Sequence, residues 1–437
     1  MLIKSEDIEL RFTKQSPTAK INLMDKQKNL PVGRQDKDHK QIGQELDLFS
    51  FHEIAPGAVF WHSKGWIIYR TLQEFIREKL ALEGYQEIST PVMVKSDLFK
   101  KSGHWDFYSE HMFNLNVENE PYSLKPMNCP ESSLVYATKT RSYQDLPLRL
   151  TEFGVLHRNE LSGVLGGLFR VRQFVIDDAH HFVRSDQIQD EIHKLLLLVV
   201  DFYKSLNFKP EFYFATKPDK AMGDAKLWRE AERDLEIALK SAKVKYGVKE
   251  KDGAFYGPKI DIHIKDSQNR DWQLATIQLD FQIPERLKLE YIDNAGKAKR
   301  PVIVHRAILG SLERFIGILT EHYQGSFPTW LSPIQVLLLP IADRHEGYAR
   351  KLTEELKENG IRTELDNRPE RLQAKIRDAT LQKVPYMGII GDRETESRGL
   401  KIENRKISVR TREGKDLGQM KFSAFLQKLK EEIDKKI

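Results

Sequence analysis

The chain has 437 residues, of which 40% are hydrophobic and 31% charged, and its formal net charge is +6. This length exceeds what one hydrophobic core usually serves, so we expect two globular domains, and the modest basic charge permits a polyanionic partner without requiring one. A single cysteine excludes an intramolecular disulfide, and the longest notable apolar run, Leu195 to Val200, is too short to span a bilayer. Because no apolar secretory signal opens the chain, we predict a cytoplasmic protein with no membrane association.

The first forty residues are polar, carry mixed charge and show no sustained period. We predict that residues 1–40 form a poorly ordered leader, and that compact structure begins at Leu46.

The next segment has the pattern of a helix followed by a strand. Apolar residues recur at helical spacing between Ser63 and Leu82, and Gly84 follows as a stop signal. The stretch from Tyr85 to Pro91 alternates and then meets proline, which indicates a strand that ends at a sheet edge or an interface.

Strand patterns then dominate up to residue 330. They cover Pro147 to Val183, Trp272 to Phe281 and Val302 to His305, with helical patterns at Gln187 to Leu206 and Lys226 to Ala242. Strands gathered around helices in this uneven order predict an α+β domain over residues 41–330, with a mostly antiparallel sheet.

The pattern becomes regular after Pro333. A buried strand at Val336 to Leu339 begins an alternation of strands and helices that includes a helix from Glu370 to Gln382 and a strand from Tyr386 to Gly391. A strand pair and a helix from Ser423 to Ile433 follow, so residues 334–437 are predicted to form a small α/β domain. This domain has 23 basic and 18 acidic residues, so it carries +5 of the net charge.

One predicted hairpin has the side chains of a nucleotide site. Arg158 stands early in it, a loop with three glycines follows, and Phe174 stands late. An arginine can bind the α-phosphate as a bidentate donor, and a phenylalanine ring can stack on adenine. On spacing alone, these residues could equally be surface arginines of an ordinary hairpin.

Three segments together resemble the motifs of class II aminoacyl-tRNA synthetases. The helix and strand that end at Pro91 resemble motif 1, residues 153–172 resemble motif 2, and Gly310 to Phe315 resemble motif 3. Three motifs in the right order make the match specific.

Further segments resemble threonyl-tRNA synthetases in particular, and the likeness runs from about Asp47 to the C-terminus. The matching segments are Gly103–Asp106, Lys125–Pro130, Asp177–His180, Phe255–Lys259 and His305–Gly310. The resemblance implies a class II catalytic domain followed by an anticodon-binding domain. It also implies ATP-dependent ligation of L-threonine to tRNA(Thr) through a threonyl-adenylate, in a homodimer.

The resemblance implies one zinc ion per chain, bound by Cys129, His180 and His305, which selects the amino acid. One thiolate and two imidazoles suit a catalytic zinc with an open fourth position. From the residues alone, the cysteine could equally be a buried apolar residue, because the sequence gaps match no local zinc pattern. Strand alternation places Phe174, Ile176, Asp178 and His180 on one face, and it turns His181 away as a structural residue.

The other site residues are also carried over from the resemblance. Arg158, Arg314 and His104 are implied to be catalytic, with His104 a base near the tRNA 3′ end. From the residues alone, His104 could equally be a histidine packed beside Trp105. The ATP site, which also binds Mg²⁺, would consist of Arg158, Glu160, Arg170, Phe174, Gln273, Ser311 and Arg314. The threonine site would consist of Met127, Asp178, Tyr256 and Gln278. The anticodon site would include Lys375, Arg377, Glu396 and Arg412.

The chain departs from the family pattern at three positions and in its extent. Glu131 and Ser132 replace a common Gly-His pair, and Ile176 stands where glutamine is common. The N-terminal editing region of many members is not visible, so the sequence is either that of a naturally short enzyme or a truncated one. In both cases we expect this chain to release Ser-tRNA unless a separate editing protein clears it. The alternatives are a synthetase-like paralogue that binds RNA without charging it, and an amino acid ligase with a different acceptor.

Overall fold

The computed structural model describes residues 36–437, so most of the predicted leader lies outside the described residues. Helix α2 (His39–Glu45) begins directly after Asp38, whose carboxylate accepts a hydrogen bond from the Gln41 amide at 2.8 Å. The predicted start of compact structure at Leu46 is therefore too late. Ile42 of α2 is buried in the main core together with Leu46, and this packing fixes the helix.

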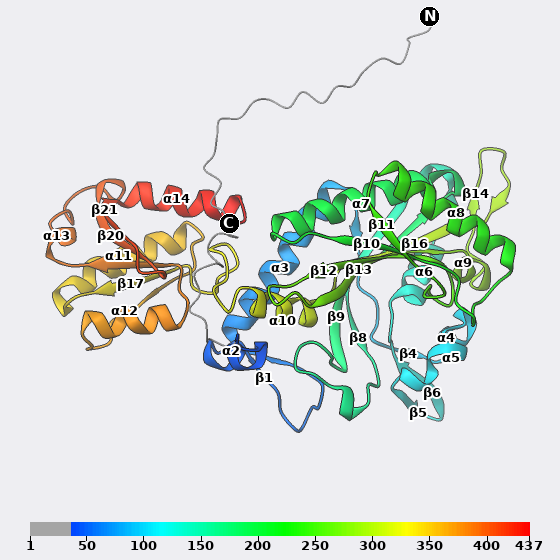
Figure 1. Cartoon of the computed structure of the whole chain (residues 1–437), viewed down its shortest axis with the longest axis horizontal. Helices are drawn as coiled ribbons and strands as arrows, with labels where there is room; N and C mark the ends of the chain where they lie inside the picture. The colour runs from blue at the N-terminus through cyan, green and yellow to red at the C-terminus, as the bar shows by residue number, and fades with distance from the viewer. Residues whose placement is uncertain (1–35) are drawn as a thin grey trace, which may run out of the picture. The chain divides into compact units, whose positions relative to one another are not determined.

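An eight-stranded sheet forms the centre of the first domain (Figure 1). Its strands follow the order β11-β10-β12-β13-β16-β9-β8-β3, and every neighbouring pair is antiparallel except the two outermost pairs. This arrangement confirms the predicted α+β class. The strands are β3 (Gln86–Glu87), β8 (Leu148–His157), β9 (Gln173–Val183), β10 (Glu211–Ala215), β11 (Tyr246–Lys249), β12 (Lys259–Lys265), β13 (Asp271–Asp280) and β16 (Val302–Ser311).

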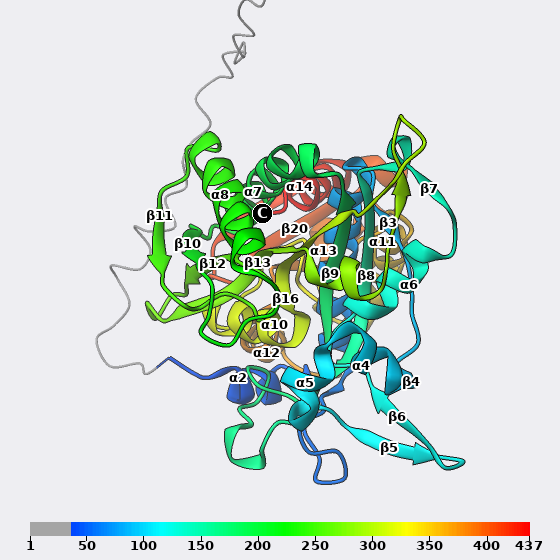
Figure 2. The same cartoon turned by 90° about the vertical axis from the view of Figure 1, so that its right-hand side faces the viewer.

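Four amphipathic helices contribute apolar side chains to one large core with this sheet, and a shorter helix, α6, contributes to a second apolar cluster. Figures 1 and 2 show the places of α6, α7, α8 and α10 relative to the sheet. The helix predicted over Ser63 to Leu82 has those bounds, and its apolar stripe faces the main core. These apolar side chains are therefore buried within a single chain, and by themselves they do not require a partner subunit. The helices are α3 (Ser63–Leu82), α7 (Ile188–Ser205), α8 (Ala225–Ser241), α10 (Leu312–His322) and α6 (Cys129–Ala137).

The strand predicted from Tyr85 to Pro91 is shorter in the structure. Only Gln86 and Glu87 pair with β8, because the Thr90 amide turns to the Glu152 carboxylate at 2.8 Å. Small elements complete this part of the chain. They are β1 (Phe49–Ser50), β2 (Phe60–Trp61), β4 (Met93–Lys95), β5 (Asn114–Val117), β6 (Glu120–Leu124), β7 (Arg141–Ser142), β14 (Tyr291–Ile292), β15 (Ala298–Lys299), α4 (Asp97–Ser102), α5 (His104–Tyr108) and α9 (Gln282–Arg286).

The C-terminal region has its own five-stranded sheet and its own core. The strand order is β18-β17-β19-β20-β21, with parallel pairing among the first three and antiparallel pairing in the rest. The predicted alternation is therefore present. The elements are β17 (Val336–Pro340), α11 (Glu346–Glu358), β18 (Thr363–Leu365), α12 (Leu372–Leu381), β19 (Tyr386–Ile390), α13 (Asp392–Thr395), β20 (Lys406–Thr411), β21 (Asp416–Lys421) and α14 (Phe422–Asp434). Among residues 36–437, every helix is too short or too polar to cross a membrane.

Candidate active site

Strand β9 carries the side chains that organise the site. Side chains alternate across a strand, so Phe174, Asp178 and His180 lie on one face. His181 lies on the other face and its Nδ1 is 3.1 Å from the Glu191 carboxylate. Burial lowers the pKa of His181 to about 4. The geometry agrees with a structural role for His181 and leaves the other face of β9 for ligands.

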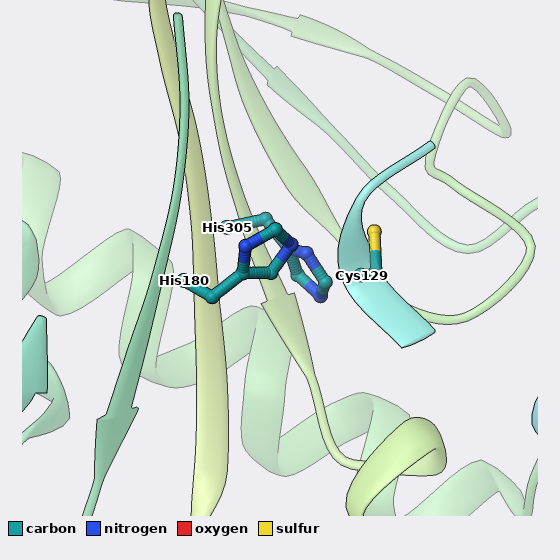
Figure 3. A group of neighbouring side chains, drawn as sticks. All are labelled: Cys129, His180 and His305. Carbon is teal, nitrogen blue, oxygen red and sulfur yellow. The ribbon is translucent and has the colours of Figure 1, made fainter. Parts of the chain in front are cut away.

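Cys129, His180 and His305 meet at one point on this face (Figure 3). Cys129 is the first residue of α6, and His180 pairs directly with His305 across strands β9 and β16. One ligand atom from each residue lies within 4.8 Å of the other two, and all three side chains are buried. Residues that are 51 and 125 positions apart in sequence thus form one cluster.

The donor set of this cluster fits a zinc ion. His180 Nε2 and His305 Nδ1 are buried and have no hydrogen-bond partner among the described residues, which is unusual for buried polar atoms. Burial lowers the pKa of His180 well below its usual value and so favours the neutral imidazole that binds metals. Burial raises the pKa of the Cys129 thiol, although a coordinated metal would take the thiolate form.

Asp280 is a member of the site that the sequence did not predict. Its Oδ2 lies 3.0 Å from His305 Nε2, on the side of the ring away from the unpartnered Nδ1. A carboxylate in this position fixes the orientation and tautomer of a metal-binding histidine. Alternation along β13 places Asp280 on the same face as Gln278, so this residue could have been found by extending that face along the strand.

The predicted threonine residues adjoin the metal cluster. Gln278 pairs with His305 across the sheet, and its Oε1 accepts a hydrogen bond from the Tyr256 hydroxyl. The Tyr256 ring centroid is 5.2 Å from that of His305, and Met127 packs in the small core that contains Cys129. Two strands and the loop before β12 thus bring the predicted threonine residues beside the metal cluster.

Asp178 is the acidic residue among those predicted to bind threonine. Its Oδ2 accepts a hydrogen bond from Asn128 at 3.1 Å and lies 3.9 Å from His180 Nε2. Burial raises the pKa of Asp178 to about 6, although His305 and the Asn128 hydrogen bond both oppose the shift. A carboxylate held in this way can accept a hydrogen bond from an ammonium or hydroxyl group.

The seven residues predicted to bind ATP all line one pocket of about 300 Å³. The pocket lies between the β8–β9 hairpin, β13 and the start of α10. Ile176, the departure from the family pattern on β9, lines the same pocket. The residues predicted to bind ATP are Arg158, Glu160, Arg170, Phe174, Gln273, Ser311 and Arg314.

Three arginines concentrate positive charge in this pocket. The Arg158 guanidinium carbon lies 5.1 Å from the centre of the Phe174 ring, and Arg314 Nε donates to the Phe169 carbonyl at 2.9 Å. Burial and the nearby Arg158 and Arg170 lower the pKa of Arg314. Arg170 is partly neutralised by Glu160 at 2.8 Å. Two further arginines beyond this ion pair leave an excess of positive charge, which suits a polyphosphate.

His104 lies at the start of α5 and is fully buried. Its Nδ1 is 2.9 Å from the Ser102 hydroxyl, while its Nε2 has no hydrogen-bond partner among residues 36–437. Burial, with smaller effects from His305 and Arg286, lowers the pKa of His104 to about 3. The imidazole is therefore neutral, and its low pKa makes it a weak base in this arrangement.

The two departures that follow Cys129 are also buried. Both Glu131 carboxylate oxygens and the Ser132 hydroxyl have no hydrogen-bond partner within the described part of the chain. Burial raises the pKa of Glu131 to about 8. They are therefore not solvent-exposed substitutions, and they alter the interior next to a predicted zinc ligand.

The predicted anticodon residues occupy different environments. Lys375 is buried and its Nζ donates to the carbonyls of Asp366 and Pro340, at 2.9 and 3.2 Å. Arg412 donates to the Phe327 carbonyl at 2.6 Å. Both side chains thus hold the backbone in this structure, and their contacts with RNA stay a prediction. Arg377 and Glu396 are exposed and remain the predicted RNA contacts.

Family models match both halves of the described chain. The model described as "tRNA synthetase class II core domain (G, H, P, S and T)" matches residues 113–323, and that described as "Anticodon binding domain" matches residues 335–432. The first match contains every predicted ATP residue and all three members of the metal cluster. The second match contains the four predicted anticodon residues.

Individual relatives point the same way. The chain is 50% identical over 414 residues to the threonine–tRNA ligase of Caldanaerobacter subterraneus subsp. tengcongensis. This match covers 95% of this chain and 63% of that protein. It is 48% identical over 425 residues to the threonine–tRNA ligase of Clostridium botulinum (strain Langeland), covering 97% and 65%. The chain therefore spans a little under two thirds of the length of these curated relatives.

Among solved structures, the chain is similar to one titled as the RNA binding domain of threonyl-tRNA synthetase from Cryptosporidium parvum Iowa II. The two are 39% identical, with a TM-score of 0.87, and the match covers 91% of this chain and 98% of the other. A second similar structure is titled "Crystal structure of putative threonyl-tRNA synthetase ThrRS-1 from Aeropyrum pernix". It is 26% identical with a TM-score of 0.77, and the match covers 91% of this chain and 96% of the other.

Proposed function

Because the chain belongs to the threonyl-tRNA synthetase family of class II, we propose that it ligates L-threonine to tRNA(Thr) with the use of ATP. The observation that carries the proposal is the shared face of β9. Phe174 at one end of this face lines the basic pocket, and His180 at the other end belongs to the metal cluster. A nucleotide and an amino acid bound at these two places would meet between them, where a threonyl-adenylate can form.

The chain's own residues account for adenylate formation. Phe174 would stack on adenine, while Arg158 and Arg314 donate hydrogen bonds to the α-phosphate as the threonine carboxylate attacks it. Mg²⁺ bound with ATP would neutralise charge on the remaining phosphates. Arg314 is already oriented by the Phe169 carbonyl, so less ordering is required when the nucleotide binds.

Threonine would be recognised beside Cys129, His180 and His305. Zinc held by these residues would supply an open coordination position that favours an amino acid with a side-chain hydroxyl. Asp178 would accept a hydrogen bond from the substrate ammonium, and Gln278 would hold the Tyr256 hydroxyl beside the metal cluster. Asp280 would keep the His305 ring in place.

Transfer to tRNA requires a base near the terminal ribose, and the family resemblance is what assigns this role to His104. Its imidazole is neutral, and its Nε2 is buried without a partner among the described residues. Nε2 would accept the proton released when the ribose oxygen attacks the adenylate. The C-terminal domain would bind the anticodon stem-loop, with Arg377 and Glu396 as exposed contacts.

The proposal includes a homodimer formed around the motif 1 segment. Support comes from exposed apolar side chains at both ends of α3, where Trp66 is 45% and Leu82 is 88% exposed. Thr90 and Pro91 also line a mainly apolar cavity of about 930 Å³. Light scattering at micromolar concentration tests the oligomeric state, and a monomer would contradict this part of the proposal.

Threonine-dependent exchange between ATP and pyrophosphate, followed by charging of tRNA(Thr), tests the activity. We expect both reactions. Exchange without charging would indicate a ligase for another acceptor. Absence of both, with RNA binding retained, would indicate a synthetase-like paralogue.

A further inference from the structure

A short helix outside the class II core match contacts the nucleotide pocket through one side chain. His39 is the first residue of α2 and is 98% buried, and the core match begins only at residue 113. Its ring packs against Phe169, with the ring centroids 4.2 Å apart. Phe169 lines the pocket that also contains Arg158 and Arg314. The imidazole thus lies directly behind a wall of the proposed ATP site.

The hydrogen bonds of His39 define its tautomer. Nε2 accepts a hydrogen bond from the Leu168 amide at 3.0 Å, so Nε2 carries no proton. Nδ1 therefore carries the proton and donates it to the Glu321 carboxylate at 2.6 Å. The same carboxylate accepts from the His39 backbone amide at 2.9 Å. Both ring nitrogens are used, which fixes the ring rigidly between α10 and the motif 2 loop.

The loop in front of the ring is shaped to receive it. Gly167 has a φ of +53°, and a Cβ atom at this position would lie 2.2 Å from His39 Nε2. A larger residue would therefore be strained and would also push the imidazole away. This contact explains why the last of the three loop glycines is needed there.

Helix α10 holds the same loop at a second point. Arg314 near its start donates to the Phe169 carbonyl at 2.9 Å, and Glu321 near its end holds His39. The loop residues Leu168 and Phe169 are thus bound on two sides by groups that α10 sets in place. If the His39 contact is lost, the Leu168 amide is left buried without a partner and the Phe169 wall can shift.

We propose that His39 is a positioning residue for the ATP pocket, acting through Leu168 and Phe169 without touching substrate. This inference rests on the proposed function, because it assigns the pocket to ATP. It makes α2 part of the catalytic apparatus, although α2 precedes the three motifs in sequence. We expect an effect on ATP binding and little effect on threonine binding, since Phe169 lines the nucleotide pocket and the predicted threonine residues do not.

The test compares His39→Ala, His39→Gln and the wild-type chain in threonine-dependent exchange. His39→Ala should raise the KM for ATP about tenfold, as the loss of one hydrogen bond to a buried amide predicts, and change the KM for threonine less than about twofold. His39→Gln, whose amide oxygen can accept from Leu168, should recover the KM for ATP to within about threefold. His193→Ala, a partly exposed histidine on α7, is the matched control and should match the wild type.

Titration calorimetry with ATP alone separates this inference from the proposed function. If the wild type binds ATP but shows no threonine-dependent exchange, the proposed function fails, and the change in ATP affinity still tests His39. Equal rises in both KM values, or an unchanged KM for ATP in His39→Ala, would overturn the inference. Should His39→Ala not fold, the inference stands only if soluble His39→Gln shows a small ATP-specific defect, and it fails if that variant affects both substrates alike.

Discussion

The predicted ligand residues of the catalytic sheet and those of the C-terminal domain differ in whether the fold itself provides hydrogen bonds for their polar atoms. On the catalytic sheet, His180 Nε2 and His305 Nδ1 are buried without a hydrogen-bond partner among residues 36–437, and they face the only cysteine. In the C-terminal domain, Lys375 and Arg412 are mostly buried too, but their nitrogen atoms donate to backbone carbonyls. Both sets of residues were carried over from the same family resemblance.

The difference shows how to separate a ligand residue from a structural one. A buried polar atom that lacks a partner costs free energy on folding unless something binds it, so two such imidazole nitrogens that face one thiol form a candidate ligand site. A buried lysine whose ammonium group is hydrogen-bonded by the fold needs no ligand to account for it. The two histidines have buried nitrogen atoms without a hydrogen-bond partner among residues 36–437, whereas Lys375 and Arg412 donate to backbone carbonyls. Substitutions at the two sets of residues should therefore have different effects.

The largest effect is expected at the basic pocket of the catalytic sheet. Arg158→Ala should reduce threonine-dependent exchange by about 10²–10³-fold, because a donor to charge that develops at the α-phosphate is lost. Metal content should remain unchanged, since Arg158 does not contact the cluster. Exchange within a few-fold of wild type would return Arg158 to the role of a surface hairpin residue.

The next effect concerns the metal. Cys129→Ala should reduce bound zinc from one ion per chain to a small fraction, because only two imidazole ligands remain. Elemental analysis of purified protein measures this directly, and threonine activation should fall with the zinc. The assignment would be wrong if this variant kept both full zinc and full activation.

Lys375 tests the opposite behaviour in the C-terminal domain. Lys375→Met should lower the free energy of unfolding by about 1–3 kcal/mol, because the carbonyls of Pro340 and Asp366 lose their donor. The KM for tRNA should stay close to that of the wild type. Thermal unfolding and charging kinetics check the two parts, and a raised KM for tRNA at unchanged stability would show that Lys375 contacts RNA.

The smallest effect is expected at Arg377, which is exposed on α12. Arg377→Ala should weaken tRNA binding a few-fold and reduce the salt dependence of log K by about 1, as for the loss of one phosphate contact. Arg350→Ala, an exposed arginine on α11 that pairs with Glu346, serves as the control. Equal effects of the two substitutions would show only a general loss of positive charge.

Local patterns predicted most of the fold. Ile68, Leu72 and Ile76 repeat at helical spacing, and the helix has the predicted bounds because those side chains all face the main core. Strand alternation alone predicts that Phe174 and His180 share one face of β9, because side chains two, four or six positions apart point the same way. The strand before Pro91 was predicted too long, because a side-chain contact from Glu152 replaces the sheet pairing at Thr90.

The parts that sequence did not reveal depend on contacts between distant segments. Asp280 meets His305 only because β13 and β16 are neighbours, and His39 meets Leu168 across 129 positions. The burial of Lys375 follows from the packing of α12 beside β17, which no local pattern encodes. The family resemblance implied the three metal ligands. Only the structure shows that His180 Nε2 and His305 Nδ1 lack a hydrogen-bond partner among residues 36–437.

The central claim is that the cluster of Cys129, His180 and His305 makes the pocket selective for a side-chain hydroxyl. Exchange between ATP and pyrophosphate, measured in parallel with threonine, serine and valine, tests this claim most directly. We predict that valine is rejected by about 10⁴-fold relative to threonine, and that serine, which lacks only a methyl group, is disfavoured by about 10–200-fold. Valine activated as readily as serine would contradict the account.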